Sequence, residues 1–457
     1  MSQGPKPIES QNNVNELFLK VLKNSEECRL KESRFALKNN CVSVIAGQEI
    51  GRSFLNKFKL KRYFEMKKIK AILKESEDEL QLHAKEFVRQ GKDIQPFQDF
   101  LNGFFKELED EKMGIDLYKG MYTSWMAELP LSMKQKRINE ILLPGTHNSG
   151  AYKIDFTKHL NSNSKWKWAN FAGRYIPFIG GIIREWVITQ DSTIFEQLEQ
   201  GIRVLDLRVS INQSDSEQFV ISHSFACIPL EEVLQQILAF MEKHQEEVVV
   251  ITMKPDWAHR TEIAEYERRM LMQVQRVIGD FLCKKRSRNP CFDCNMTLEN
   301  MVQHNERILF FYSCRKIKNV CDLNFVWPGK YVNEVWDDTS DKVQKLTCLQ
   351  KHFKAVKGSE RSFNEIPLTL TPQYSDVKRN LWQRLVFSTA NQTSIRNMAS
   401  TMHQELGYIL CEHQGALTNF SSVICDFIDR SGLVHQIVQE NYRREKREHA
   451  SAGNIET

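Results

Sequence analysis

The strongest constraint on the fold is a repeated alternation of short apolar runs with longer amphipathic runs, which begins near Trp125. Short apolar runs predict buried strands, and apolar residues three and four positions apart predict helices. The candidate strands span residues 137–143, 202–209, 219–223, 247–253, 307–312, 325–332, 366–371 and 422–427. The helices between them include residues 192–200, 229–244, 260–281 and 376–406. Eight strands in this order favour an α/β fold of the TIM (β/α)8 barrel type, with a doubly wound open sheet as the alternative.

The first candidate strand runs into the sequence ILLPGTHNSGAY, residues 141–152, and carries His147 at its carboxyl end. The apolar residues suit a buried parallel strand, and we expect Pro144 and Gly145 to end it. Asn148 and its polar neighbours place hydrogen-bonding groups around the imidazole. A histidine after a strand is more often structural than catalytic, so its companions must decide its role.

Other ionisable residues fall at the carboxyl ends of candidate strands, where TIM barrels carry their active sites. In GIRVLDLRV, residues 201–209, Asp206 and Arg208 alternate with apolar residues and therefore share one face of the strand. The third, fourth and eighth strands end, in that order, in His223, Lys254 and Asp426. A barrel would bring all these side chains to one mouth.

Two histidines, an arginine, a lysine and two carboxylates suit the cleavage of an anionic phosphodiester, which needs a base, an acid and fixed positive charge. An unperturbed imidazole titrates near pH 6.5, roughly, so one histidine can start neutral and the other protonated. Neither histidine accompanies a serine in a G-x-S-x-G context, so a serine triad is not supported. The plainer alternatives are a structural ion pair of Asp206 with Arg208 and a solvated strand end at Lys254. The joint placement of these residues favours the functional interpretation.

Several ordered motifs resemble the phosphatidylinositol-specific phospholipase C X-domain-containing proteins. The motifs are WMAELP, LPGTHNSG, WVITQ, GIRVLDLR, ISHSF, EEVVVITMK, VWPGKYVNEVWDDT and VICDF. They extend over roughly residues 121–441. The resemblance implies a distorted TIM-type barrel that cleaves phosphatidylinositol-type lipids through attack of the inositol 2-hydroxyl on phosphorus, which gives diacylglycerol and a cyclic inositol phosphate. It also implies that His147 is the general base, that Asp426 orients it, and that His223 is the general acid.

The resemblance gives the remaining polar residues supporting roles. Arg208 would hold a phosphoryl oxygen, Lys254 would bind inositol or phosphate, and Asp206 would be a hydrogen-bond partner. The larger calcium-dependent signalling phospholipases C share this motif order but carry carboxylates where this chain has Arg208 and Lys254. A calcium ion needs six to eight oxygen ligands, roughly, and Asn148 and Asp206 alone cannot hold it. We therefore expect an activity that needs no metal and no other cofactor.

Two positions depart from the pattern of many single-domain relatives. Those relatives have an aspartate where this chain has Asn148, so a carboxylate expected to raise the basicity of the acid histidine is missing. His223 is followed by Ser224 instead of the usual glycine, which we expect to narrow the approach of substrate. Two alternatives stay open. One is a catalytically weak or inactive phosphoinositide-binding or scaffold protein. The other is a metal-dependent glycerophosphodiester phosphodiesterase, which would need further carboxylate ligands near His147.

The amino-terminal region differs from the rest in being charged throughout and helical in pattern. We expect residues 1–120 to form this helical region, residues 121–445 the barrel, and residues 446–457 a polar tail. Residues 52–74 carry eight lysines and arginines beyond Arg52, one acid, and interleaved apolar side chains. Such a helix can lie on an anionic membrane, serve as a calmodulin-like target, or pack on the barrel with a solvated lysine face.

The remaining features bear on location and partners. The first residues lack a signal-peptide pattern, and no run of about 18 apolar residues occurs, so we expect a cytoplasmic protein, peripheral at anionic membranes. The aromatic residues 165–187 either dip into the membrane interface or cap the barrel. A net charge of +5 gives no reason to expect a nucleic acid partner. The odd number of cysteines, eleven, predicts reduced thiols, and a zinc site at Cys291 and Cys294 lacks a second ligand pair.

Overall fold

The computed structural model describes residues 77–89, isolated positions between 91 and 120, and most of residues 121–453. The main gaps in the second part are 161–166, 213–217, 257–262, 287–291, 293–295, 314–322, 357–361, 378–393 and 429–431. The chain divides into two compact units, Met1–Lys119 and Gly120–Thr457. In the first unit the structure describes helix α4, Glu77–Arg89. The basic residues 52–74 lie outside the described residues.

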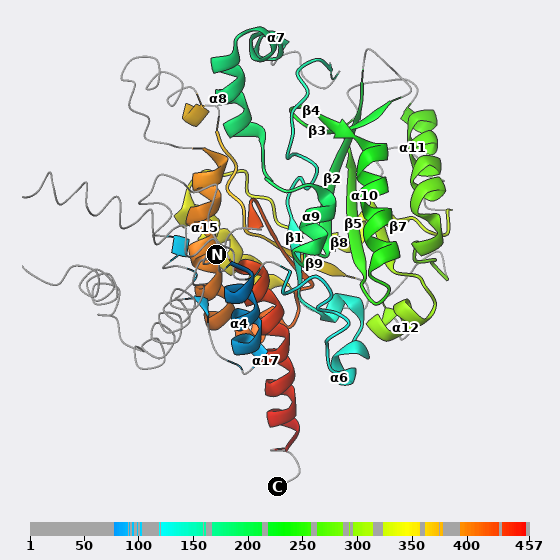
Figure 1. The fold of residues 1–457 in the computed structure, drawn as a ribbon, viewed down its shortest axis with the longest axis vertical. Helices are drawn as coiled ribbons and strands as arrows, with labels where there is room; N and C mark the ends of the chain where they lie inside the picture. Colours follow the sequence, from blue (N-terminus) through cyan, green and yellow to red (C-terminus); the bar gives the residue numbers. More distant parts are fainter. Residues whose placement is uncertain are drawn as a thin grey trace, which may run out of the picture. The chain divides into compact units, whose positions relative to one another are not determined.

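The second unit is built on a parallel sheet that curls into a distorted barrel (Figure 1). Its strands follow the order β7-β6-β5-β2-β1-β10-β9-β8, and every neighbouring pair along this path is parallel. The strands are β1 Leu143–Thr146, β2 Val204–Ile211, β5 Val249–Pro255, β6 Ile308–Tyr312, β7 Trp327–Pro328, β8 Val332–Asn333, β9 Phe363–Pro367 and β10 Ser422–Cys425. The end strands β7 and β8 are joined by the 3-10 turn Gly329–Tyr331. The expected distorted α/β barrel is confirmed.

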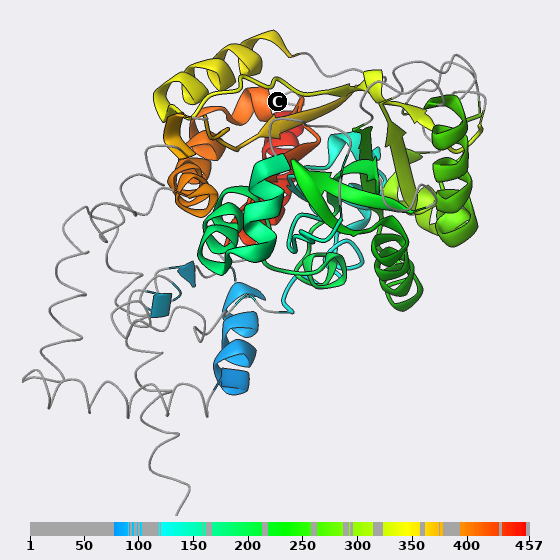
Figure 2. The same cartoon turned by 90° about the horizontal axis from the view of Figure 1, so that it is seen from above.

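Helices cover the outside of the curled sheet, as Figures 1 and 2 show. They are α9 Ile194–Glu199, α10 Leu230–Lys243, α11 Ile263–Ile278, α12 Leu298–Gln303, α13 Lys342–Ala355, α15 Ile395–Glu412, α16 Gln414–Leu417 and α17 Leu433–Gly453. Each covering helix needs one apolar face towards the sheet. In helix α10 this face consists of buried residues that recur every three or four positions, Leu230, Val233, Leu234 and Ile237. Short helices α6, Leu131–Lys134, and η3, Ile138–Glu140, precede the first strand. Among the described residues, no helix is long and apolar enough to cross a membrane.

The first strand begins later than the sequence predicted, and the expected strand end at Pro144 and Gly145 is wrong. Both residues lie inside β1, paired with Val423 and Ile424 of β10. The Pro144 carbonyl accepts a hydrogen bond from the Arg203 N–H at 2.8 Å, so Pro144 contributes its acceptor to the ladder although it has no N–H to donate. Nearby, Trp125 Nε1 donates to the Gly201 carbonyl at 3.0 Å.

The predicted third strand is correct in its bounds but does not belong to the barrel. Strand β3, Phe219–His223, pairs antiparallel with the carboxyl half of β2 and forms a hairpin with β4, Phe225–Pro229. The reason is the length of β2, whose last residues extend past the barrel and offer an edge to β3. The predicted sixth strand is split by a 3-10 turn into β7 and β8. At the carboxyl end, helix α17 continues to Gly453, through most of the expected polar tail.

Candidate active site

His147 and Asp426 meet because β1 and β10 are adjacent and parallel. Thr146 is paired with Cys425, so the next residue of each strand lies at the same level. His147 Nδ1 is 2.8 Å from Asp426 Oδ1, and both side chains are buried. The backbone N–H of His147 donates to the Cys425 carbonyl at 2.9 Å. The structure thus brings together the predicted base and the carboxylate predicted to orient it.

A backbone turn of the same kind follows three of the predicted site residues. His147, His223 and Asp426 are each followed by a residue with positive φ: Asn148 at 43°, Ser224 at 59° and Phe427 at 50°. This left-handed conformation is unfavourable for residues other than glycine, and such strain is concentrated at functional sites. The sharp turn ends the strand and leaves the preceding side chain directed into the mouth. The usual glycine after the acid histidine suits this conformation, and Ser224 adopts it at a cost.

The other ring nitrogen of His147 is surrounded by donors. Asn148 Nδ2 lies 3.0 Å from His147 Nε2, and Arg208 Nη2 lies 3.4 Å from the same atom. With the Nδ1 proton directed to Asp426, Nε2 is the acceptor of both. Position 148 was expected to act on the predicted acid, His223, whereas the structure places the Asn148 amide against the predicted base, His147.

Lys254 and Asp206, two further predicted residues, form a cluster of charged side chains with Glu334 next to Arg208. Arg208 and Lys254 are paired across β2 and β5. Lys254 Nζ lies 2.6 Å from Glu334 Oε1 and 3.5 Å from Asp206 Oδ1. Burial alone would raise the pKa of Asp206, but the positive charges of Lys254 and Arg208 outweigh it and lower that pKa to about 2. Asp206 is therefore ionised, and it also accepts a hydrogen bond from the Asn148 N–H at 3.2 Å.

His223 faces His147 from the β3–β4 hairpin, with the ring centroids 6.2 Å apart. Its Nδ1 lies 2.7 Å from the carbonyl oxygen of Val187, which fixes the Nδ1–H tautomer. Burial, followed by the positive charge of Arg208, lowers the pKa of His223 to about 3. In the free protein the ring is thus neutral at pH 7, with Nε2 free of a proton.

Three residues at this site were not predicted from the sequence. The Trp336 ring lies over the His147 ring, with centroids 5.0 Å apart, and Glu334 pairs with Lys254. Glu365 is fully buried in β9, and burial followed by the charge of Glu334 raises its pKa to about 8. Glu334 and Trp336 belong to the motif VWPGKYVNEVWDDT, which was a signal for them. Glu365 precedes the predicted strand start at 366, so no signal marked it.

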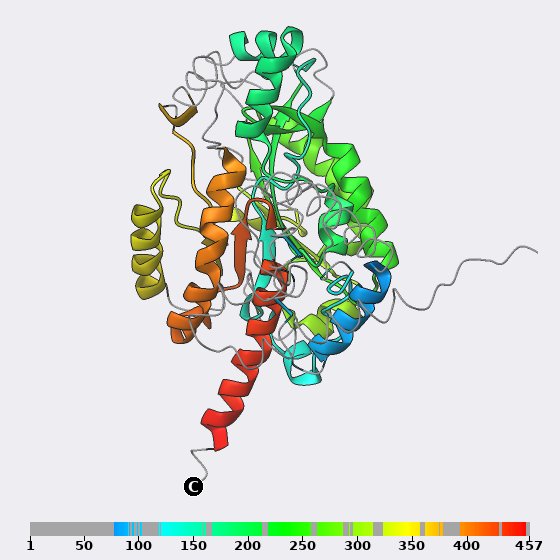
Figure 3. The ribbon, with the colours of Figure 1, turned by 60° about the vertical axis from the view of Figure 1, so that its left-hand side comes forward.

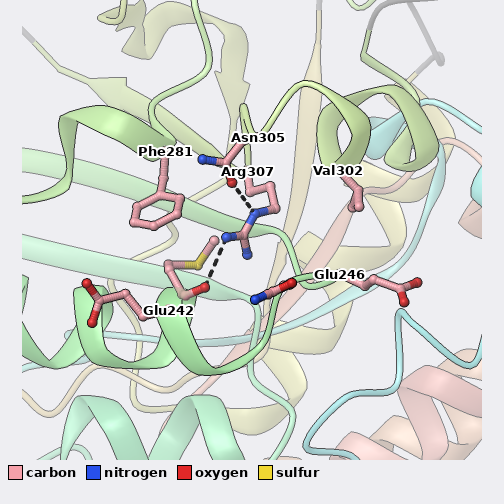
Figure 4. A pocket seen from close by; sticks show the side chains of 8 residues that line it. Glu242, Glu246, Phe281, Val302, Asn305 and Arg307 are labelled. Atoms are coloured by element: carbon pink, nitrogen blue, oxygen red, sulfur yellow. Dashed lines mark hydrogen bonds between the residues drawn. The ribbon is translucent and has the colours of Figure 1, made fainter.

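Two other locations that could have been functional are not part of this site. Arg307, at the opposite end of the barrel, lines a pocket of about 460 Å³ with Glu242, Glu246, Phe281 and others, none of them a predicted site residue (Figure 4). Its guanidinium donates to the carbonyl groups of Met241 and His244 at the end of α10, which is a structural role. Cys291 and Cys294 lie outside the described residues. Within the described part of the chain, no group of three or more His, Cys, Asp or Glu side chains could hold a metal.

Comparison with known proteins agrees with this geometry. Residues 185–312 match the family model described as phosphatidylinositol-specific phospholipase C, X domain. The PI-PLC X domain-containing protein 2 of Mus musculus is 26% identical over 319 residues, which cover 69% of this chain and 87% of that protein. The PI-PLC X domain-containing protein 3 of Danio rerio is 25% identical and covers 70% of this chain and 94% of its own length. The predicted resemblance to this family is confirmed.

Solved structures with similar folds include bacterial enzymes. The phosphatidylinositol-specific phospholipase C from Listeria monocytogenes has a TM-score of 0.45 and 15% identity, and covers 70% of this chain and 98% of its own. A structure of the phosphatidylinositol-specific phospholipase C of Staphylococcus aureus has a TM-score of 0.48 and 15% identity, with coverage of 70% and 97%.

Proposed function

We propose that this chain, whose sequence resembles the PI-PLC X domain-containing proteins, cleaves phosphatidylinositol-type lipids into diacylglycerol and a cyclic inositol phosphate. The observation that carries the proposal is the pair of facing histidines, one held by Asp426 through Nδ1 and the other by the Val187 carbonyl. In both rings Nδ1 is thereby occupied, and Nε2 is left for proton transfer. One such nitrogen can remove a proton while the other supplies one.

In the first half of the reaction, His147 Nε2 takes the proton of the inositol 2-hydroxyl. The 2-oxygen forms a bond to phosphorus, and the positive imidazole is stabilised by Asp426. Asn148 and Arg208 occupy Nε2 in the free protein, so the substrate must displace both donors. Arg208 then turns to the phosphoryl oxygen. Its Nε is buried without a hydrogen-bond partner among the described residues and is available for that anion.

In the second half, the bond from phosphorus to the glycerol oxygen breaks, and His223 Nε2 supplies the proton to that oxygen. His223 is neutral in the free protein, so it must gain a proton when substrate binds. The negative phosphodiester provides the reason, because an opposite charge beside the ring favours its protonated form. Lys254 contacts inositol or phosphate, and the exposed indole of Trp336 offers a flat surface beside the base.

The proposed reaction needs no calcium. Arg208 and Lys254 lie side by side on β2 and β5, at the carboxyl end of the barrel. A guanidinium is always charged and can bind two phosphoryl oxygens, so it supplies the electrostatic stabilisation that a metal would otherwise give. Fixed cations at these two positions would also repel a divalent ion.

We further propose a membrane contact through helices α7, Lys167–Tyr175, and α8, Pro177–Val187. Both helices lie at the end of the barrel unit away from the carboxyl terminus of α17 (Figures 1 and 3). Phe171, Tyr175 and Ile176 are 65%, 60% and 45% exposed there. Exposed aromatic side chains favour the membrane interface. The described cysteines are free thiols, which supports action from the cytoplasm.

The membrane contact is tested by vesicle sedimentation of the double variant Phe171→Ser with Tyr175→Ser. We expect weaker binding to vesicles of phosphatidylinositol and phosphatidylserine. Tyr408→Ser is the matched control, because Tyr408 is 54% exposed on α15. Equal binding by all three proteins would remove α7 from the proposal.

A second candidate function is lipid binding with weak or no catalysis. It is favoured by the two donors on His147 Nε2 and by the neutral state of His223, because both oppose proton transfer in the free protein. The decisive experiment incubates the purified protein with phosphatidylinositol vesicles and measures cyclic inositol phosphate. We expect its formation by the wild type, and a loss of about 100-fold or more in His147→Ala and in His223→Ala with folding retained. Binding to the vesicles without product would establish the second candidate.

A further inference from the structure

The short segment 187–190, which begins at the last residue of helix α8, contacts several parts of the site. The Val187 carbonyl holds His223 Nδ1. Thr189 Oγ1 donates to the Asn148 carbonyl at 3.0 Å, and the Phe427 N–H donates to the Thr189 carbonyl at 2.9 Å. The segment therefore contacts the His223 ring and the turns that end β1 and β10.

Gln190 makes the most direct of these connections. Its Nε2 donates to the His147 carbonyl at 2.9 Å and to the Cys425 carbonyl at 3.2 Å. The first carbonyl belongs to the predicted base, and the second precedes Asp426. The Gln190 side chain is 1% exposed, so water does not compete for these hydrogen bonds.

We infer that Gln190 is a positioning residue for the pair of His147 and Asp426, an assignment that rests on the proposed function. The β1–β10 ladder reaches the bond from the His147 N–H to the Cys425 carbonyl. Beyond it both chains turn away through residues with positive φ, Asn148 and Phe427. The amide of Gln190 joins the two strand ends at this point and so keeps His147 Nδ1 at 2.8 Å from Asp426.

Loss of Gln190 should slow the proposed reaction, because proton transfer is sensitive to the positions of the reacting groups. Displacing a reacting group by about 1 Å can reduce the rate roughly 100-fold. Loss of a residue that orients a metal-ligating histidine typically reduces activity about 10- to 100-fold, and we expect a comparable loss for a histidine that transfers a proton. The hydrogen bonds of Gln190 go to two backbone carbonyl groups, so its loss should reduce kcat and leave KM within about twofold.

The chain contains a closely matched control in Gln197 of helix α9. Its side chain is 0% exposed, and its Nε2 also donates to two carbonyl groups, those of Ser149 at 2.9 Å and Ser192 at 2.8 Å. In both glutamines Oε1 has no hydrogen-bond partner among the described residues. Gln190→Met and Gln197→Met therefore each remove two hydrogen bonds to carbonyl groups from a buried position. We expect similar losses of stability from the two variants.

The test compares these variants in the cyclic inositol phosphate assay and in histidine nitrogen-15 spectra. We expect kcat to fall about 10- to 100-fold in Gln190→Met and less than about threefold in Gln197→Met. The spectra report which ring nitrogen of His147 carries the proton, with its signals assigned by their loss in His147→Gln. We expect the Nδ1–H form in the wild type and in Gln197→Met, and a mixture of both forms in Gln190→Met.

The outcomes distinguish failure of the positioning role of Gln190 from failure of the proposed function. Equal kinetic losses in the two variants, or an unchanged His147 tautomer in Gln190→Met, would overturn the assignment. The spectra need no substrate, so they decide the positioning role even if the wild type makes no cyclic product. In that case the proposed function fails, while a tautomer change confined to Gln190→Met still supports the role of Gln190.

Discussion

The side-chain amide of Asn148 donates to Nε2 of His147 at 3.0 Å, on the side of the ring away from Asp426. An aspartate at this position would add a second carboxylate beside the same ring. Asparagine instead presents an N–H to Nε2, the nitrogen that accepts the substrate proton in the proposed reaction. The proposed base is therefore held between a carboxylate and two donors, and binding of the lipid head group must rearrange the donors before reaction.

Arg208 should be essential for turnover. Removing one preorganised donor to a developing phosphoryl anion costs about 3 to 4 kcal/mol, so we expect Arg208→Ala to reduce kcat about 100- to 1,000-fold. Arg208→Lys should recover only part of this loss, because a point charge replaces a planar fork. The measurement is the rate of cyclic inositol phosphate formation. Arg276→Ala, at an exposed arginine paired with Glu231, should retain the wild-type rate. Wild-type turnover by Arg208→Ala would disprove the assignment.

Turnover should not depend on calcium. The cations Arg208 and Lys254 are paired across β2 and β5, where the proposed reaction places the phosphate. We expect the same rate of product formation in excess chelator and in millimolar calcium. A rate abolished by chelator and restored by calcium would contradict the metal-free reaction.

Ser224→Gly should stabilise the protein. Ser224 has a φ of 59°, which costs a residue with a side chain about 1 to 2 kcal/mol. The greater freedom of glycine in the unfolded chain offsets about 0.5 to 1 kcal/mol of this. We therefore expect a net gain of about 0.5 to 1 kcal/mol in the free energy of unfolding by urea. Ser224→Ala is the control, because it keeps the strain. If alanine and glycine gave the same stability, backbone strain would not be the cause.

Stability should fall in acid partly because of His223. Its pKa is about 3 in the folded protein against an ordinary value of 6.5. The unfolded chain therefore binds a proton between these values that the folded chain does not, and stability decreases as the pH falls from 6.5 towards 3. The pKa values of His352 and His403 are also lowered by burial and act in the same direction.

The check is the urea midpoint measured from about pH 7 to about pH 5, where the free histidine titrates, for the wild type and His223→Gln. We expect a smaller decrease in the variant, while His304→Gln, at an exposed histidine, should follow the wild type. An identical pH dependence in His223→Gln and wild type would show that His223 does not stay neutral in the folded protein.

Several site residues could be found from the sequence because the signal is local. His147, His223 and Asp426 each end an apolar run. Parallel strands bring the ends that carry His147 and Asp426 together, whereas the antiparallel β3–β4 hairpin brings His223. Asp206 and Arg208 were found through strand alternation alone. Glu365 could not be found this way, because it lies inside a buried strand and its environment comes from Glu334, Lys254 and Asp206 on other elements.

The amino-acid sequence by itself determined the alternation of strands and helices and the identity of the residues at the strand ends, because apolar periodicity acts within a few residues. Only the tertiary structure decided how these segments meet. It turned β3 back against β2, placed Pro144 inside β1, and set the amide of Asn148 against His147. Each of these outcomes depends on a contact between atoms fixed by the packing of the whole barrel. The range of such contacts is illustrated by the link from Gln190 to Cys425, which joins residues 235 positions apart.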